Sequence, residues 1–132
     1  MPIESRHLAV VIHRPPAEVA AFAGDPAHLP LWAAGLASGI REEQGRWFAD
    51  SPMGAVEVAF VPANGLGVLD HDVVLPDGSR TTNPLRVLPY GEDAEVVFSL
   101  RREAGVPDEA FEADARAIRE DLERLRSVLE AR

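Results

Sequence analysis

The last quarter of the chain, residues 108–132, constrains the fold more than any other stretch. Its apolar side chains recur at steps of three and four residues and so form one stripe along a helix: Phe111, Ala115, Ile118, Leu122, Leu125 and Leu129. Asp108 is the expected N-cap, because its carboxylate can accept from the free amides of the first turn. Such a helix is about 35 Å long, so an apolar surface elsewhere must cover the stripe.

The opposite face of this predicted helix is charged. Acidic and basic side chains stand four residues apart there, spaced to form the ion pairs Glu112/Arg116, Arg116/Glu120 and Glu120/Arg124. Taken alone, the heptad-like stripe also fits a coiled-coil dimer. The stripe lasts less than three heptads, however, and the segment upstream predicts an antiparallel sheet with an apolar face. Packing within the chain is therefore the preferred interpretation.

Composition indicates one domain spanning residues 1–132. Apolar residues make up 46% of the chain and charged residues 27%, which is ordinary for a soluble globular protein. No apolar run approaches the roughly 20 residues of a membrane span, and the N-terminus lacks the apolar core of a signal peptide, so a cytoplasmic location is expected. The net charge of −9 argues against nucleic acid and anionic membranes as partners.

Two residue types with chemical roles are missing from the sequence. Without cysteine the chain has no disulfide, no thiolate metal ligand and no cysteine nucleophile. All thirteen basic residues are arginine, so a lysine Schiff base and a lysine general base are also excluded. Composition leaves the oligomeric state open between a monomer and a homodimer.

The N-terminal part of the chain predicts one strand followed by two short helices. The strand covers residues 6–13, and one of its faces carries Leu8, Val10 and Ile12. A proline pair then ends the strand and opens a helix over 17–23, because the first helical amides need no partner. The inward side chains of that helix are Val19 and Phe22. A second short helical turn is predicted over 27–32.

Turn residues divide the middle of the chain into short strands, expected at 39–43, 46–50, 55–61, 67–75, 80–88 and 94–102. Residues 51–54 and 62–65 form turns, and Pro76-Asp77-Gly78-Ser79 is a strong hairpin signal. Asn83-Pro84 indicates a sheet edge or a bulge. The expected class is therefore α+β, with a curved antiparallel sheet of six to seven strands around the long C-terminal helix.

Several short motifs in this order resemble the SRPBCC superfamily, which includes START lipid-transfer domains, birch-pollen-type proteins and polyketide cyclase/dehydrase-like proteins. The matching stretches cover nearly the whole chain: IHRPPAEV (12–19), Phe22, Asp25, Trp32, Gly39-Ile40, Gly45-Arg46-Trp47, GVLDHDVVLPDG (67–78), NPLRV (83–87) and EVVFSL (95–100). The resemblance implies a helix-grip fold, whose sheet wraps round the C-terminal helix and leaves a cavity for an apolar ligand. Ala20 stands where relatives often carry a bulky aromatic, which bears on the size of that cavity.

His71 is the first candidate for chemistry. In a strand over 67–75 it shares a face with Leu69, Val73 and Leu75, so in a helix-grip fold its imidazole would point into the cavity. There it could bind a ligand or transfer a proton. The alternative is a buried histidine that is hydrogen-bonded for structural reasons.

The hairpin signal predicts the neighbours of His71. A two-residue loop at Asp77-Gly78 places His71 opposite Pro84, with Arg86 as its diagonal neighbour on the same face. His71, Arg86 and Asn83 would then form a polar group inside an apolar pocket. The alternative is a surface charge pair beside an edge strand. One extra loop residue would shift this register.

The remaining pocket candidates are aromatic. Trp32 and Trp47 are expected near the mouth of the cavity, and Phe111 begins the half of the long helix that would face it; each also fits the core. Asp70 and Asp72 flank His71 in sequence, but in a strand they point away from it. No metal site and no cofactor is therefore expected.

Three functions follow from the resemblance. The first is an intracellular carrier or sensor that binds a small hydrophobic molecule. The second is an enzyme of the polyketide cyclase/dehydratase type, which would use cavity side chains such as His71 as acid and base. The third is a protein-interaction domain of the co-chaperone type, with a filled cavity and an exposed apolar patch.

Overall fold

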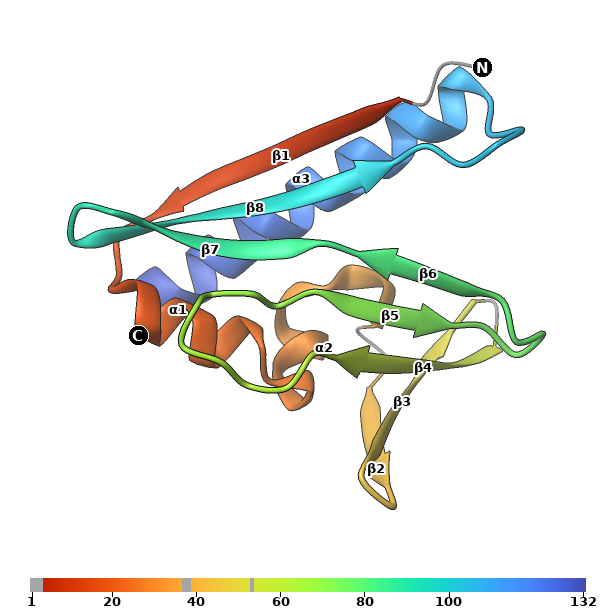
Figure 1. The fold of residues 1–132 in the computed structure, drawn as a ribbon, viewed down its shortest axis with the longest axis horizontal. Helices are drawn as coiled ribbons and strands as arrows, with labels where there is room; N and C mark the ends of the chain where they lie inside the picture. Colours follow the sequence, from red (N-terminus) through yellow and green to blue (C-terminus); the bar gives the residue numbers. More distant parts are fainter. Residues whose placement is uncertain (1–3, 37–38, 53) are drawn as a thin grey trace.

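The structure is a computed structural model that describes residues 4–36, 39–52 and 54–132. Within these residues, strands and one long helix build the α+β fold that the sequence predicts (Figure 1). Met53, in the predicted turn 51–54, lies outside the described residues. No helix in the described part of the chain is both long enough and apolar enough to cross a membrane.

The elements follow one another in the predicted order. The helical segments are α1 (Pro16–Ala23), the 3-10 turn η1 (Pro26–His28), α2 (Leu29–Trp32), the 3-10 turn η2 (Ala34–Leu36) and α3 (Asp108–Glu130). The strands are β1 (Ser5–Ile12), β2 (Ile40–Glu43), β3 (Arg46–Ser51), β4 (Gly54–Phe60), β5 (His71–Val74), β6 (Arg80–Asn83), β7 (Leu85–Tyr90) and β8 (Asp93–Arg101).

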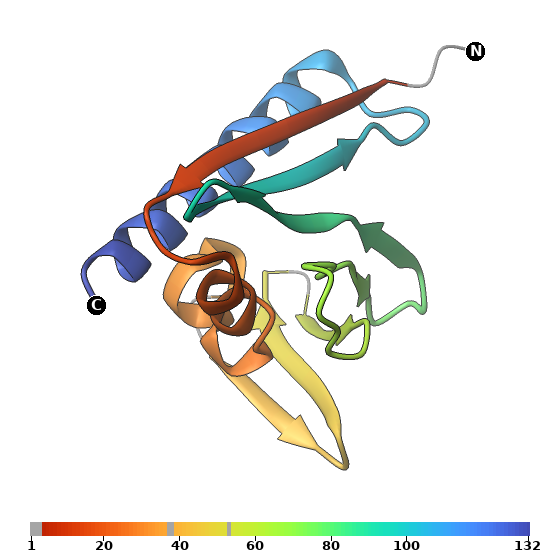
Figure 2. The ribbon, with the colours of Figure 1, turned by 60° about the vertical axis from the view of Figure 1, so that its left-hand side comes forward.

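The strands pair into two antiparallel sheets. The three-stranded sheet has the order β1-β8-β7, and the five-stranded sheet has the order β2-β3-β4-β5-β6. α3 runs along the three-stranded sheet, and α1 and α2 lie near the C-terminal end of α3 (Figures 1 and 2). The chain passes directly from β6 into β7, so the two sheets form one curved surface.

Pro84 marks the point where the two sheets join. The predicted strand 80–88 is divided there into β6 and β7, because proline has no N–H to donate to a strand ladder. The predicted strand 67–75 is divided as well, since only β5 pairs within the five-stranded sheet. Residues 67–69 pair with β7 instead, through bonds of 2.8 Å from the Val87 N–H to the Gly67 carbonyl and from the Leu69 N–H to the Leu85 carbonyl.

The N-terminal segment follows the sequence pattern closely. The alternation predicted for β1 is confirmed, because the buried side chains of this strand are Leu8, Val10 and Ile12. The proline pair does open α1: Pro15 is its N-cap and Pro16 its first residue. Val19 and Phe22 are buried, as predicted. Together these side chains form part of one hydrophobic core with the C-terminal half of α3.

The apolar stripe of α3 is confirmed. Its buried residues are Phe111, Ala115, Leu122, Leu125 and Leu129, and Ile118 is half-buried. The helix packs against β1, α2 and β8. The surface that covers the stripe therefore belongs to the same chain, and no coiled-coil partner is needed to bury it.

The predicted N-cap of α3 is wrong. α3 begins at Asp108 itself, with Pro107 in the N-cap position, so the Asp108 side chain lies past the position from which it could cap. The Phe111 N–H donates to the Pro107 carbonyl at 3.0 Å. The Asp108 carboxylate instead lies 2.7 Å from a guanidinium nitrogen of Arg102, at the start of the preceding loop.

The predicted ion pairs along α3 are also wrong. Both carboxylate oxygens of Glu112 accept from Arg6 of β1, at 2.9 and 2.7 Å. β1 lies beside α3 and presents Arg6 directly, so this contact replaces a pair within the helix. Pairs that do form within α3 have a spacing of three residues: Asp121–Arg124 and Glu123–Arg126.

The predicted register of the β5–β6 hairpin is wrong by one residue. The loop contains three residues rather than two, because the Leu75 N–H donates to the Ser79 carbonyl at 2.9 Å. Gly78, with a φ of +88°, supplies the left-handed residue that such a loop needs. His71 consequently lies opposite Asn83 and not opposite Pro84.

Candidate functional site

The inner face of the sheet, which is the face turned toward α3 and α1, brings two predicted site residues together. Phe60, His71 and Asn83 are direct cross-strand partners on β4, β5 and β6, so their side chains lie side by side on this face. His71 is buried, with only 9% of its surface exposed. Asn83 is half-buried.

The imidazole of His71 is held by Leu69, in the loop before its strand, and by Phe60. Nδ1 lies 3.0 Å from the Leu69 carbonyl oxygen, and because a carbonyl can only accept, Nδ1 carries the proton. The Phe60 ring lies against the imidazole, with 4.6 Å between ring centroids. Burial lowers the pKa of His71, and this outweighs the opposing effects of the Leu69 bond and of the carboxylates of Asp70 and Asp72. His71 is therefore neutral at neutral pH.

This burial predicts that stability falls on mild acidification. The pKa of His71 in the folded state lies below its unfolded value of 6.5, so acid protonates the unfolded chain first and stability is lost as the pH drops below about 6.5. Asp70 and Asp72 have lowered pKa values and stay ionised across this window. The measurement is the free energy of urea unfolding at several pH values, for the wild-type protein and for His71→Phe.

We expect the wild-type free energy of unfolding to fall more steeply with decreasing pH, by at most about 1.4 kcal/mol per pH unit for one proton. The other histidines are present in both proteins and cancel in the comparison. Equal slopes for the two proteins would contradict the buried, neutral state of His71.

Arg86 lies on the outer face, away from His71. Its guanidinium donates to both carboxylate oxygens of Asp70, at 2.9 and 2.7 Å, and this bond holds the pKa of Asp70 below its usual range. Asp72 also points outward, where Arg80 donates to it at 2.7 Å. Within the described residues, no group of three or more histidine, aspartate and glutamate side chains could hold a metal ion.

The aromatic candidates lie at separate places in the fold. Trp32 is buried in α2, and its carbonyl accepts from Arg124 on the C-terminal half of α3. Phe111 is buried at the start of α3, more than three helical turns from Arg124. The guanidinium carbon of Arg6 lies 4.9 Å from the centroid of its ring. Trp47 is half-buried on β3, opposite Val58.

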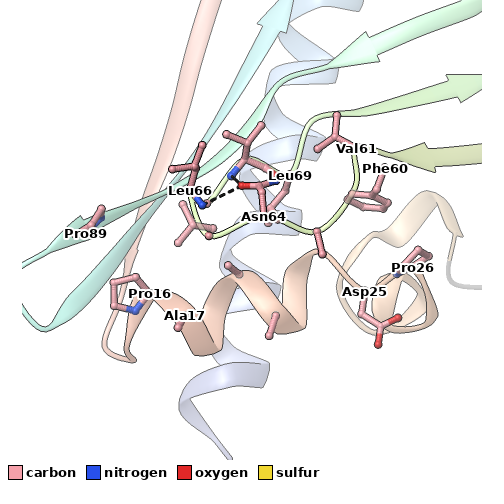
Figure 3. Close-up of a pocket in the computed structure, with 18 residues that line it drawn as sticks. Pro16, Ala17, Asp25, Pro26, Phe60, Val61, Asn64, Leu66, Leu69 and Pro89 are labelled. Carbon is pink, nitrogen blue, oxygen red and sulfur yellow. Dashed lines mark hydrogen bonds between the residues drawn. The ribbon is translucent and has the colours of Figure 1, made fainter.

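A pocket of about 670 Å³ lies between α1 and the loop 61–70, which connects β4 to β5 (Figure 3). Its volume falls in the range of about 300–1,000 Å³ that is usual for small-molecule sites. Three alanines of α1 form one wall, and apolar residues of the loop form the other. The lining includes Pro16, Ala17, Ala20, Ala21, Phe60, Val61, Leu66, Val68, Leu69, Val87 and Pro89.

The loop 61–70 is held in shape by its own polar groups. The Asn64 side chain donates to the carbonyl groups of Pro62 and Val68 and accepts from the N–H groups of Leu66 and Val68. Gly67 has a φ of +72°, and a Cβ there would lie 2.2 Å from the Val87 carbonyl oxygen. Only glycine permits this close approach. Contacts within the chain therefore hold the loop wall of the pocket in place.

The chemistry of the lining is almost entirely apolar. Among the described lining residues, only Asp25 and Asn64 have polar side chains. Asp25 caps η1 by accepting from the Ala27 N–H at 3.0 Å, and Asn64 is occupied within its loop. The pocket can thus hold an apolar molecule, but its lining presents no pair of groups for acid–base catalysis.

Several solved structures have a similar fold. No family model matches the sequence, and no curated protein matches it. Among solved structures, Ara h 8.0201 has a TM-score of 0.69 at 12% identity over 99% of this chain and 100% of its own. DynU16, from the dynemicin biosynthetic locus, has a TM-score of 0.72 at 15% identity over 98% of this chain and 48% of its own. KanY has a TM-score of 0.70 at 19% identity over 98% of this chain and 99% of its own.

The chain has a helix-grip fold, as these solved structures do. The fold implied by the sequence motifs is thereby confirmed. At these identities the likeness concerns the fold alone, and the site must be judged on this chain's own residues.

In this helix-grip fold the pocket is bounded by α1 rather than by α3. The structure describes all six residues that the sequence suggested for the pocket, and none of them lines it: Trp32, Trp47, His71, Asn83, Arg86 and Phe111. His71 does not line the pocket itself, but it contacts two residues that do, Phe60 and Leu69. The candidate site therefore includes His71 and Asn83 behind the pocket wall but excludes Arg86.

The pocket was missed because the sequence predicted a strand where a loop lies. Residues 62–65 have the composition of a simple turn, and the apolar pattern of 67–75 favoured a continuous strand. Two signals were present all the same. Leu66 is an apolar residue beside a turn signature, and Ala17, Ala20 and Ala21 leave space on the surface of α1.

Proposed function

We propose that the protein binds a small hydrophobic molecule in the pocket between α1 and the loop 61–70. The observation that carries this proposal is an apolar pocket of about 670 Å³ whose loop wall is fixed by Asn64 and Gly67. Binding then requires no ordering of the loop, which would otherwise weaken affinity. Burial of apolar surface supplies the driving force, at about 25 cal/mol per Å².

The lining favours binding over catalysis. A cyclase or dehydratase needs an acid and a base within hydrogen-bond reach of the substrate. The two polar side chains of the lining are already bonded to backbone groups of their own segments. A carrier or sensor of an apolar molecule is therefore the function that this site supports best.

Leu66 offers a direct test, because it lines the pocket and is nevertheless 81% exposed. Leu66→Ser removes apolar contact area from a ligand without opening the core. We expect the affinity for the neutral fluorescent dye Nile red to fall about tenfold. The measurement is a fluorescence titration of each folded variant, with thermal melting as the check on folding.

Leu31 provides the matched control, since it is 52% exposed in α2 and does not line this pocket. Leu31→Ser should leave Nile red affinity unchanged. Ala20→Phe, which places a phenyl group in the pocket, should reduce affinity as Leu66→Ser does. If both pocket variants bind as the wild-type protein does, the ligand does not occupy this pocket.

A further inference from the structure

The inner face of the sheet carries a polar pair next to apolar side chains. His71 and Asn83 lie directly opposite each other on β5 and β6, at the spacing where cross-strand side chains touch. Two of their neighbours on the same face are apolar: Phe60 is the partner of His71 on β4, and Leu85 follows Asn83 by two residues. The polar neighbour Thr81, two residues before Asn83, donates to Glu103 at 3.4 Å. When a ligand covers such a pair, its polar atoms need hydrogen-bond partners.

Both side chains retain unused hydrogen-bonding capacity. The proton of His71 is on Nδ1, which donates to the Leu69 carbonyl, so Nε2 keeps a lone pair and can only accept. The Asn83 side chain makes no hydrogen bond with any residue that the structure describes. Its amide nitrogen can donate two hydrogen bonds. An acceptor and a donor thus stand side by side.

Among the described residues, the pairing of β4, β5 and β6 places no arginine beside the pair on the inner face. Arg86 points to the outer face, where Asp70 neutralises it. Arg6 is an inner-face residue of β1, opposite Leu100, but it lies at the start of α3 and is bound to Glu112. No arginine lines the pocket in the part of the chain that the structure describes. An anionic group in the pocket would therefore meet no cationic side chain among the described lining residues.

We infer that His71 and Asn83 bind the hydroxyl group of a neutral apolar ligand. This inference rests on the proposed function and specifies the ligand class. A hydroxyl matches the pair because it can donate to His71 Nε2 and accept from the Asn83 amide at once. The pair adjoins the pocket through Phe60 and Leu69. With the apolar body of the ligand in the pocket, its hydroxyl has to pass these two side chains to reach the pair.

The probes are three biphenyls that differ only in one polar group: para-phenylphenol, its methyl ether and para-phenylbenzoate. Each is titrated at neutral pH as a competitor of Nile red. We expect the phenol to bind about tenfold more tightly than the ether, as one or two hydrogen bonds would give. The carboxylate should bind most weakly, because it has no cationic partner.

Two substitutions test the assignment to residues. His71→Phe keeps an aromatic ring against Phe60 but removes the acceptor, and Asn83→Leu keeps similar volume but removes the donor. Each should reduce the preference for the phenol over the ether to less than threefold, while affinity for the ether stays the same. Thr82→Val is the control, because Thr82 is on β6 next to Asn83 but on the outer face, where it bonds to Asp72.

The outcomes separate this inference from the proposed function. If no biphenyl displaces Nile red and Nile red itself does not bind, the proposed function fails. If the phenol and the ether bind equally well, the pocket stands and the hydroxyl assignment is overturned. Tightest binding of the carboxylate, or a preference that survives both substitutions, also overturns it.

Discussion

Replacing Leu125 with alanine is expected to lower the free energy of unfolding by about 2–5 kcal/mol. Leu125 lies at the centre of the buried stripe of α3 and exposes 0% of its surface. Its side chain belongs to the one core that joins α3 to β1, α1 and α2. Truncation leaves a cavity that this close-packed core cannot refill. Urea unfolding, followed by far-UV circular dichroism, measures the loss.

Leu66→Ala is the matched control for this prediction, because it is the same substitution at an 81% exposed position. It should change the free energy of unfolding by no more than about 0.5 kcal/mol. Phe111 belongs with Leu125, since it is 2% exposed and does not line the pocket, so Phe111→Ala should also destabilise the fold. If Phe111→Ala weakened Nile red binding with no loss of stability, Phe111 would be a ligand contact instead.

Replacing Gly67 with alanine is expected to lower the free energy of unfolding by about 3–4 kcal/mol and to abolish Nile red binding. A positive φ alone costs a residue with a Cβ about 1–2 kcal/mol. At Gly67 the added Cβ would also lie 2.2 Å from the Val87 carbonyl oxygen, so the backbone of the loop has to move off β7. That movement breaks the two bonds between residues 67–69 and β7, worth about 1 kcal/mol each, and opens the pocket wall.

Gly78→Ala distinguishes the cost of a positive φ from the cost of the contact between Gly67 and Val87. Gly78 has a φ of +88°, but a Cβ there would meet nothing within 4 Å. It should cost only the strain, about 1–2 kcal/mol, and leave Nile red affinity unchanged. Urea unfolding and dye titration on both variants make the comparison. Equal losses at the two glycines would mean that the contact between Gly67 and Val87 does not shape the pocket.

Local patterns were sufficient for the elements that bury one apolar face. The stripe of α3, the alternation in β1 and the proline pair before α1 all depend on the spacing of neighbouring residues. Their burial in the structure follows the predicted positions, from Leu8 to Ile12 and from Phe111 to Leu129. The helix-grip fold was implied by the resemblance to the SRPBCC superfamily.

Predictions that depended on pairing between segments fared less well. The β5–β6 register depends on the length of the hairpin loop. Because the loop has one residue more than predicted, the cross-strand partner of His71 is Asn83 and not Pro84. Arg86 was assigned to the inner face through that count, and it lies on the outer face with Asp70. Glu112 was paired within its helix, although Arg6 on a strand far away in sequence was closer.

The apolar faces, the long helix and the excluded chemistry could all be identified from the amino-acid sequence. These properties depend on residue types and on spacings along the chain. Only the tertiary structure decided where the pocket lies, because that site is made where α1 meets a loop more than thirty residues later. The shape of this loop depends on the close approach of Gly67 to Val87 and on the hydrogen bonds of Asn64 within the loop. Neither interaction produces a periodic pattern in the sequence. Distances between such segments follow from how the whole chain packs, and no local rule specifies them.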